Sequence, residues 1–146
     1  MTKEDKDLLL IDLLARLPYG VKIRLGDYDY QVCGYNSEKE MPMKIWYYYD
    51  SNLILKSYID VYLTDYRPYL RQMSSMTEEE VKEFYDVECM DVKVGYIKPT
   101  WNWHFTINGI DWLNAHHFDY RGLIEKGLAI EVTKENNPYE NKIFLM

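Results

Sequence analysis

Residues 21–32 read VKIRLGDYDYQV, and this stretch decides the fold class. Apolar side chains occupy every second position up to Leu25, which is the period of a half-buried β-strand. Gly26 and Asp27 form a turn signal, and the alternation resumes at Tyr28. The stretch therefore predicts two short strands that are joined by a tight turn.

Two further segments repeat this alternation. In residues 43–49, the odd-numbered positions face away from Lys44 and Trp46, and residues 57–66 have the same period. Four or five short strands within about 50 residues are typical of a small antiparallel barrel or a strongly bent sheet. We therefore expect such a sheet, in the size range of SH3-like folds, over residues 19–72.

A helix is predicted over residues 1–18. Leucines and Ile11 recur with helical spacing, Thr2 or Asp5 can cap the start, and Pro18 ends the run. The apolar arc is wide, so we expect the helix to pack against the rest of the chain. A helix that binds a partner protein would have the same pattern.

Residues 73–146 are predicted to add a helix-strand-helix part. Thr77 and Glu80 have the spacing of a capping box, and the acids after Thr77 suit the positive end of a helix dipole. The stretches VKVGYIKP and TWNWHFTING have strand periodicity, and Asn108–Gly109 is a turn signal. This order of elements predicts one α+β domain over residues 1–146, without the regular βαβ alternation of a parallel sheet.

Length and composition match a globular domain. The chain has 146 residues, of which 47% are hydrophobic and 28% are charged. No apolar run approaches the roughly 18 to 20 residues that span a bilayer, and the N-terminal segment has no signal-peptide pattern. Cys33 and Cys89 have neither disulfide nor zinc-binding spacing. We therefore expect a cytoplasmic protein with no cofactor, no metal and no membrane partner.

The charge distribution narrows the class of partner. A net charge of -7 disfavours binding to double-stranded nucleic acid, which requires a basic face. Acids are concentrated in residues 74–95, where seven acids accompany two lysines. This segment fits either a solvated helix face or a docking surface for a basic partner. The candidate contact residues are Glu79, Glu83 and Asp86.

The strongest candidate for chemistry is DWLNAHHFDYRGLI, residues 111–124. Adjacent side chains point in different directions in a helix or a strand, so His116 and His117 do not converge on one ion. Only His116 and Asp119 share a helix face, and their pairing requires the helix to continue through Phe118. We favour a structural interpretation, in which Asp119 caps a second short helical turn. The competing hypothesis is a metal-assisted or acid-base enzyme centred on His116, His117 and Asp119.

Aromatic residues form the second candidate. The chain has 15 tyrosines and four tryptophans, which are dense in IWYYYD (45–50) and WNWHF (101–105). Such surfaces stack on single-stranded bases or bind peptides, but a nucleic-acid platform normally interleaves cations, and only Lys44 lies close to the first cluster. Protein binding is therefore the favoured functional interpretation. The candidate contact residues are Trp46, Tyr48 and Tyr62.

Three stretches carry a resemblance: LARLPYGVK (14–22), RPYLRQMSSMTEEE (67–80) and DWLNAHHFDYRGLIEKGLAIE (111–131). Together they resemble a family of uncharacterised small proteins of Bacteroides and related gut bacteria, which is associated with prophages and other mobile elements. The resemblance implies a cytosolic accessory protein and supplies no catalytic residue. By analogy with small acidic proteins of mobile elements, it implies stoichiometric association with a host or phage component.

Catalytic motifs are missing from the sequence. It has no phosphate-binding glycine loop, GxSxG elbow, HExxH motif or dinucleotide fingerprint. The sequence therefore predicts a non-catalytic accessory protein that binds an unknown protein partner. An enzyme at the double histidine is the alternative, and binding of single-stranded nucleic acid is a weaker one.

Overall fold

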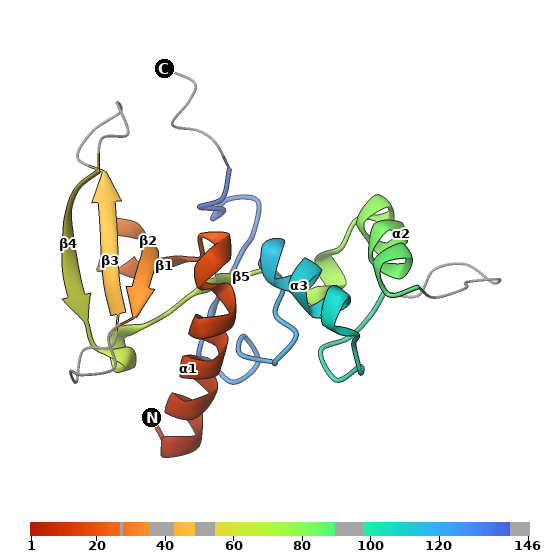
Figure 1. The fold of residues 1–146 in the computed structure, drawn as a ribbon, viewed down its shortest axis with the longest axis horizontal. Coiled ribbons are helices and arrows are strands. Elements are labelled where there is room, and N and C mark those ends of the chain that lie inside the picture. Colours follow the sequence, from red (N-terminus) through yellow and green to blue (C-terminus); the bar gives the residue numbers. More distant parts are fainter. Residues whose placement is uncertain (27, 36–42, 49–54, 90–97, 141–146) are drawn as a thin grey trace.

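A four-stranded antiparallel meander forms one end of the molecule (Figure 1). The structure, a computed structural model, describes residues 1–26, 28–35, 43–48, 55–89 and 98–140. In the first hairpin, Ile23 pairs with Tyr30, as the alternation over residues 21–32 predicts. Gly26 makes the turn with a φ of +61°, a conformation that glycine adopts without strain, and Asp27 lies outside the described residues. The strands are β1 (Lys22–Leu25), β2 (Tyr28–Tyr35), β3 (Met43–Tyr48) and β4 (Leu55–Val61).

The meander is open where a barrel would close. Its strand order is β1-β2-β3-β4, and within the described ranges β1 and β4 do not pair. The outer edge of β1 is instead bonded to the chain that follows the meander, because the Arg24 N–H donates to the Arg67 carbonyl (3.3 Å). The α+β class is confirmed, whereas the finer expectation of an SH3-like barrel is not.

The chain after β4 enters the core. The strand predicted over residues 57–66 stops early because the 3-10 turn η2 (Leu63–Asp65) redirects the chain and Tyr66 is fully buried. β5 (Tyr69–Leu70) follows and pairs in parallel with β6 (Ile130–Glu131). This segment therefore connects the meander to the C-terminal part of the molecule.

The residue after β5 extends this connection. The Arg71 N–H donates to the His117 carbonyl, and the Arg71 carbonyl accepts from the Asp119 N–H, both at 2.8 Å. The segment 67–71 thus bonds to β1 on one side and to residues 117–119 and 130–132 on the other. Parts of two of the stretches that carry the family resemblance, 67–80 and 111–131, meet at this segment.

The N-terminal helix α1 (Lys3–Arg16) begins and ends as its sequence predicts. Thr2 caps it, and Asp5 completes a capping box, so both predicted capping residues take part. Pro18 lies in the 3-10 turn η1 (Leu17–Tyr19) that follows the helix. No helix in the described part of the chain is long and apolar enough to cross a bilayer.

Two helices build the C-terminal part. The 3-10 turn η3 (Met73–Ser75) leads into α2 (Glu78–Val87), and the capping box of Thr77 and Glu80 is present as predicted. The second helix, α3 (Ile107–Ala115), packs against α2. Figure 1 shows α1 between the meander and these two helices.

The start of α3 corrects the sequence-based prediction. Residues 98–106 are irregular rather than strand, and Asn108–Gly109 lies in the first turn of α3 instead of a β-turn. Thr106 caps the helix, and the Glu88 carboxylate accepts from its N–H (3.1 Å). A Cβ atom at position 109 would overlap the Glu88 carboxylate, so the glycine leaves room for the side chain that binds the start of α3. The strand expected in residues 92–97 lies outside the described part.

Two hydrophobic clusters form the core. The first joins α1 and β1 to the chain beyond α3 and contains Leu9, Leu13, Val21, Ile23, Val32, Tyr66, Leu70, Leu123 and Leu128. The second lies around α2 and α3 and contains Met73, Met76, Val81, Phe84, Tyr85, Trp112, Leu113, Phe118 and Tyr120. Trp112, Leu113, Phe118 and Leu123, which surround the double histidine in the sequence, are all buried in these clusters.

The capping box of α2 gives a first testable prediction. Thr77→Ala removes the hydroxyl that accepts from the Glu80 N–H (3.1 Å), so one backbone donor loses its partner. We expect the free energy of unfolding to fall by about 1 kcal/mol in a urea titration. Ser74→Ala, at an exposed position in the preceding turn, should change it by less than about 0.5 kcal/mol. Equal effects of the two substitutions would contradict the capping role.

Candidate functional site

α3 ends at the double histidine in a Schellman motif. His117 has a φ of +63° and follows the cap residue His116. Its N–H donates to the Asn114 carbonyl (3.2 Å), and the Phe118 N–H reaches back to the Leu113 carbonyl (2.9 Å). Glycine or asparagine is usual at the left-handed position, so the side chain at 117 is held there by its tertiary contacts.

The two histidine rings contact different parts of the molecule. His116 Nδ1 lies 2.8 Å from the Trp112 carbonyl, and its ring stacks on the Trp112 ring with centroids 4.0 Å apart. The His117 ring stacks on Tyr139, with centroids 3.7 Å apart and planes 8° from parallel. The adjacent histidines therefore diverge, as expected from their sequence positions.

Asp119 is a buried turn cap. Its Oδ1 accepts from the Leu123 N–H and its Oδ2 from the Ile124 N–H, each at 2.9 Å. The predicted capping role is thus confirmed, and the predicted short helical turn follows it, because the Lys126 N–H donates to the Gly122 carbonyl (3.2 Å). Residues 123–127 do not extend into a longer helix. Gly127, at the end of this turn, has a left-handed φ of +74°, and its N–H donates to the Ile124 carbonyl (3.0 Å), which stops the helical turn there.

His116, His117 and Asp119 do not form a ligand set. Pairing of His116 with Asp119 required the helix to continue through Phe118, but α3 ends at Ala115. Among the described residues, no three His, Cys, Asp or Glu side chains lie close enough together to hold a metal ion. Each of the three candidate residues has a structural contact instead.

His117 lies in a cationic environment. Burial, followed by the charges of Arg16, His116, Arg71 and Lys22, lowers the pKa of His117 from 6.5 to about 4. Its Nδ1 is buried and has no hydrogen-bond partner within the described ranges. The imidazole is therefore neutral at pH 7.

A buried charge cluster lies beside this region. The Asp12 Oδ1 atom accepts from Arg16 Nε and from Arg121 Nη1, both at 2.8 Å. Arg16 Nη2 also donates to the Phe118 carbonyl (2.6 Å), and both arginines lie over the Tyr120 ring. Sequence reasoning missed this cluster; its signal is an acid and an arginine with i,i+4 spacing inside a leucine-rich helix.

The predicted acidic surface lies on α2. Glu79, Glu83 and Asp86 are exposed and follow i, i+4, i+7 spacing, so they share the face opposite the buried Phe84. Glu83 has a structural contact as well, because its Oε1 accepts from Trp112 Nε1 (2.9 Å). We call Glu79, Glu83 and Asp86 the acidic face.

Two other acids of this segment, Glu80 and Glu88, hold the helix in place. Glu80 forms a two-point ion pair with Arg71 (2.7 and 2.8 Å). Burial alone would raise the pKa of Glu80, but the bonds from Arg71 and Thr77 outweigh it and lower this pKa. Glu88 is buried against the start of α3. The local excess of acids therefore has two roles, anchoring and surface charge.

The predicted aromatic surface is described only in part. Trp46 and Tyr48 lie in β3, opposite Tyr58 and Leu55 of β4, but their side chains lie outside the described part. Tyr62 follows β4, and 43% of its surface is exposed. An exposed tyrosine is therefore present beside the sheet.

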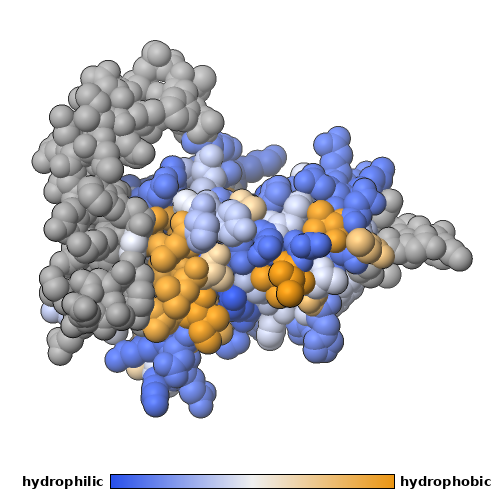
Figure 2. Space-filling view, viewed as in Figure 1, coloured by the Kyte–Doolittle hydropathy of each residue, from blue (hydrophilic) through white to orange (hydrophobic). Residues whose placement is uncertain are grey.

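α1 also has an apolar outer face, which the helical spacing of its leucines alone does not locate. Ile11 is 55% exposed and Leu14 is 46% exposed, one turn apart on the same side of the helix. Figure 2 shows this apolar band over α1, next to the meander. The opposite side of the helix, with Leu9 and Leu13, is buried in the first cluster.

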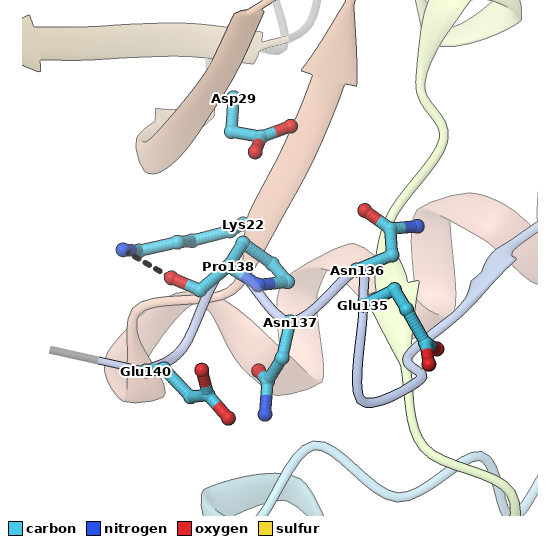
Figure 3. A pocket seen from close by; sticks show the side chains of 7 residues that line it. All are labelled: Lys22, Asp29, Glu135, Asn136, Asn137, Pro138 and Glu140. Atoms are coloured by element: carbon cyan, nitrogen blue, oxygen red, sulfur yellow. Dashed lines mark hydrogen bonds between the residues drawn. The ribbon is translucent and has the colours of Figure 1, made fainter. Parts of the chain in front are cut away.

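A polar hollow of about 480 Å³ lies between the first hairpin and the C-terminal loop, lined by Lys22, Asp29 and residues of 135–140 (Figure 3). Lys22 Nζ donates to the Pro138 carbonyl (2.8 Å), and burial lowers the pKa of this lysine. Asp29 lies at the opposite side of the hollow from Glu140. The carboxylates therefore do not converge.

Comparison of the chain with protein-family models, with curated proteins and with solved structures finds no match.

Proposed function

We propose that this protein acts by binding a basic protein partner through the acidic face of α2, rather than by catalysis. The observation that carries the proposal is the arrangement of Glu79, Glu83 and Asp86 on one exposed helix face. Complementary charge accelerates encounter and selects the partner. The partner surface should therefore carry lysines or arginines at a matching spacing.

Rigid attachment of α2 supports this proposal. The helix is capped by Thr77, paired to Arg71 through Glu80, and bonded to α3 through Glu83 and Glu88. A surface that is held in one conformation loses less conformational entropy on binding than a mobile one. The acidic face is thus pre-organised for a complementary surface.

The family resemblance supports an accessory role. In the context of a phage or another mobile element, the partner would be a basic host or phage protein in the cytoplasm. The aromatic residues Trp46, Tyr48 and Tyr62 are the second contact surface of this proposal. Binding of an extended peptide there would combine stacking with main-chain contacts.

The acidic face is tested with the triple variant Glu79→Gln, Glu83→Gln, Asp86→Asn in pull-downs from host lysate. The amide introduced at position 83 still offers an oxygen to Trp112 Nε1, so the variant removes charge and keeps the packing. We expect the triple variant not to capture the partner. We also expect the wild-type protein to lose the partner at about 0.5 M salt, which screens the charges. Unchanged capture by the variant would refute this surface.

A matched control keeps the number of removed charges constant. Glu125, Glu131 and Glu135 are exposed outside α2, and their replacement by Gln should leave capture unchanged. A second variant, Trp46→Ala with Tyr48→Ala and Tyr62→Ala, tests the aromatic surface separately. Loss of capture in the control would show that net charge alone is responsible.

A further inference from the structure

The C-terminal strap, defined as residues 130–140, is attached to β5 by backbone bonds. The Ile130 N–H donates to the Pro68 carbonyl and the Val132 N–H to the Leu70 carbonyl, both at 2.8 Å. Only two residue pairs form the parallel ladder of β5 and β6. So short a ladder holds a segment weakly unless side chains add to it.

Tyr139 is the side-chain anchor of the strap. Its hydroxyl donates to the Tyr69 carbonyl (2.7 Å) and accepts from the Lys22 N–H (3.0 Å). Lys22 Nζ binds the neighbouring Pro138 carbonyl (2.8 Å). Burial raises the pKa of Tyr139, so the hydroxyl keeps the proton that it donates. This one side chain therefore bonds the strap to β1 and β5 together.

The position of the Tyr139 ring depends on His117, which stacks against it. The charged groups that face His117 come from every neighbouring element: Arg16 from α1, Lys22 from β1, Arg71 after β5, and His116 at the end of α3. The acids beside these cations are already paired, Asp12 with Arg16 and Glu80 with Arg71. A proton on His117 therefore lies among three permanent cations, Arg16, Lys22 and Arg71.

We propose that the C-terminal strap is released by acid, through protonation of His117. The added proton would place a charge among Arg16, Lys22 and Arg71 and, at Nδ1, an N–H with no acceptor in the described surroundings. Movement of the imidazole relieves both costs and removes the surface on which Tyr139 packs. The attraction between an imidazolium and the Tyr139 ring acts in the opposite direction, and the experiment measures the balance.

The sign and size of the effect follow from linkage. Burial and then the neighbouring cations lower the pKa of His117 from 6.5 to about 4 in the folded state, so the closed strap favours the neutral ring. Its contribution to strap stability is complete above pH 6.5 and is lost as the pH falls towards 4. If release of the strap leaves the imidazole fully solvated, the equilibrium constant for strap opening rises about 20-fold between pH 7 and pH 5, and this is the largest rise that the shift allows.

Hydrogen exchange of the full chain, read by mass spectrometry at pH 7, 6 and 5 and corrected for the intrinsic rate, tests this release. We expect protection of residues 130–140 to fall severalfold, up to about 20-fold, while protection of α2 in the same sample stays constant. His117→Asn suits the left-handed backbone and does not titrate, so it should abolish the pH dependence. His116→Gln is the matched control and should preserve it.

Two results would overturn the proposal: equal strap protection at pH 7 and pH 5, or an NMR titration of wild-type His117 with a pKa near 6.5. The NMR titration decides the question even if His117→Asn does not fold. Loss of protection in the strap and α2 together would indicate global unfolding and would also contradict local release. Tyr139→Phe keeps the stacking and removes the hydroxyl, so it should weaken strap protection at every pH.

Discussion

Asp12→Ala should lower the free energy of unfolding by about 3–5 kcal/mol, because it leaves a buried guanidinium without its counter-charge. Asp12 and Arg16 are both fully buried, and Asp12 Oδ1 also accepts from Arg121. Arg121 is partly exposed and can turn to water, whereas Arg16 cannot. Urea unfolding followed by circular dichroism measures the loss, and a change below about 1 kcal/mol would contradict the buried pair.

The loss of free energy of unfolding in Asp12→Ala should come from the unpaired Arg16 charge rather than from the lost contact. Asp12 Oδ2 and Arg16 Nη1 have no partner within the described ranges, so the pair is incompletely satisfied even in the wild type. The double variant Asp12→Ala, Arg16→Met should therefore be less destabilised than Asp12→Ala alone. Asp7→Ala, on the exposed side of the same helix, should change stability by less than about 0.5 kcal/mol.

Phe84→Ala is expected to lower the free energy of unfolding by a similar amount, about 3–5 kcal/mol, because it opens a cavity in the second hydrophobic cluster. The Phe84 ring is fully buried, with its centroid 5.3 Å from that of Trp112 and 5.6 Å from that of Phe105. These neighbours belong to α3 and the preceding loop, so collapse around the missing ring requires both to move. Urea unfolding again gives the measurement.

Ile107→Ala is the matched control for Phe84→Ala. Ile107 is 79% exposed at the first position of α3, although it is as apolar as a core residue. Its truncation should change the free energy of unfolding by less than about 0.5 kcal/mol. A large loss at Ile107, or a small one at Phe84, would show that α2 and α3 pack differently.

Local patterns predicted the elements whose causes lie within a few residues. Alternation over residues 21–32 predicted the first hairpin, and the spacing of Thr77 and Glu80 predicted the start of α2. The cap at Thr2 and the stop at Pro18 bounded α1 to within two residues. In each case the hydrogen bonds or the periodicity that define the element are local.

Local sequence patterns gave the wrong element where a contact with a residue distant in the sequence determines the structure. Asn108–Gly109 is a turn signal, but Glu88 occupies the space beside position 109 and Thr106 caps a helix there. The stretch TWNWHFTING has strand periodicity, but residues 98–106 are irregular and α3 follows them. For the candidate site, the divergence of His116 and His117 was predictable from the helix period, whereas the stacking of His117 on Tyr139 was not.

The sequence by itself determined the α+β class, the hairpin, the two capped helices and the position of the acidic face, because each depends on neighbours along the chain. Only the tertiary structure decided that β1 bonds to the segment after the meander, that Arg16 is buried against the carbonyl of Phe118, and that His117 packs on Tyr139. Arg16 and Phe118 are 102 residues apart, so no local period reports their contact. These features arise where burial forces distant polar groups to find partners, and that requirement exists only after the chain has packed.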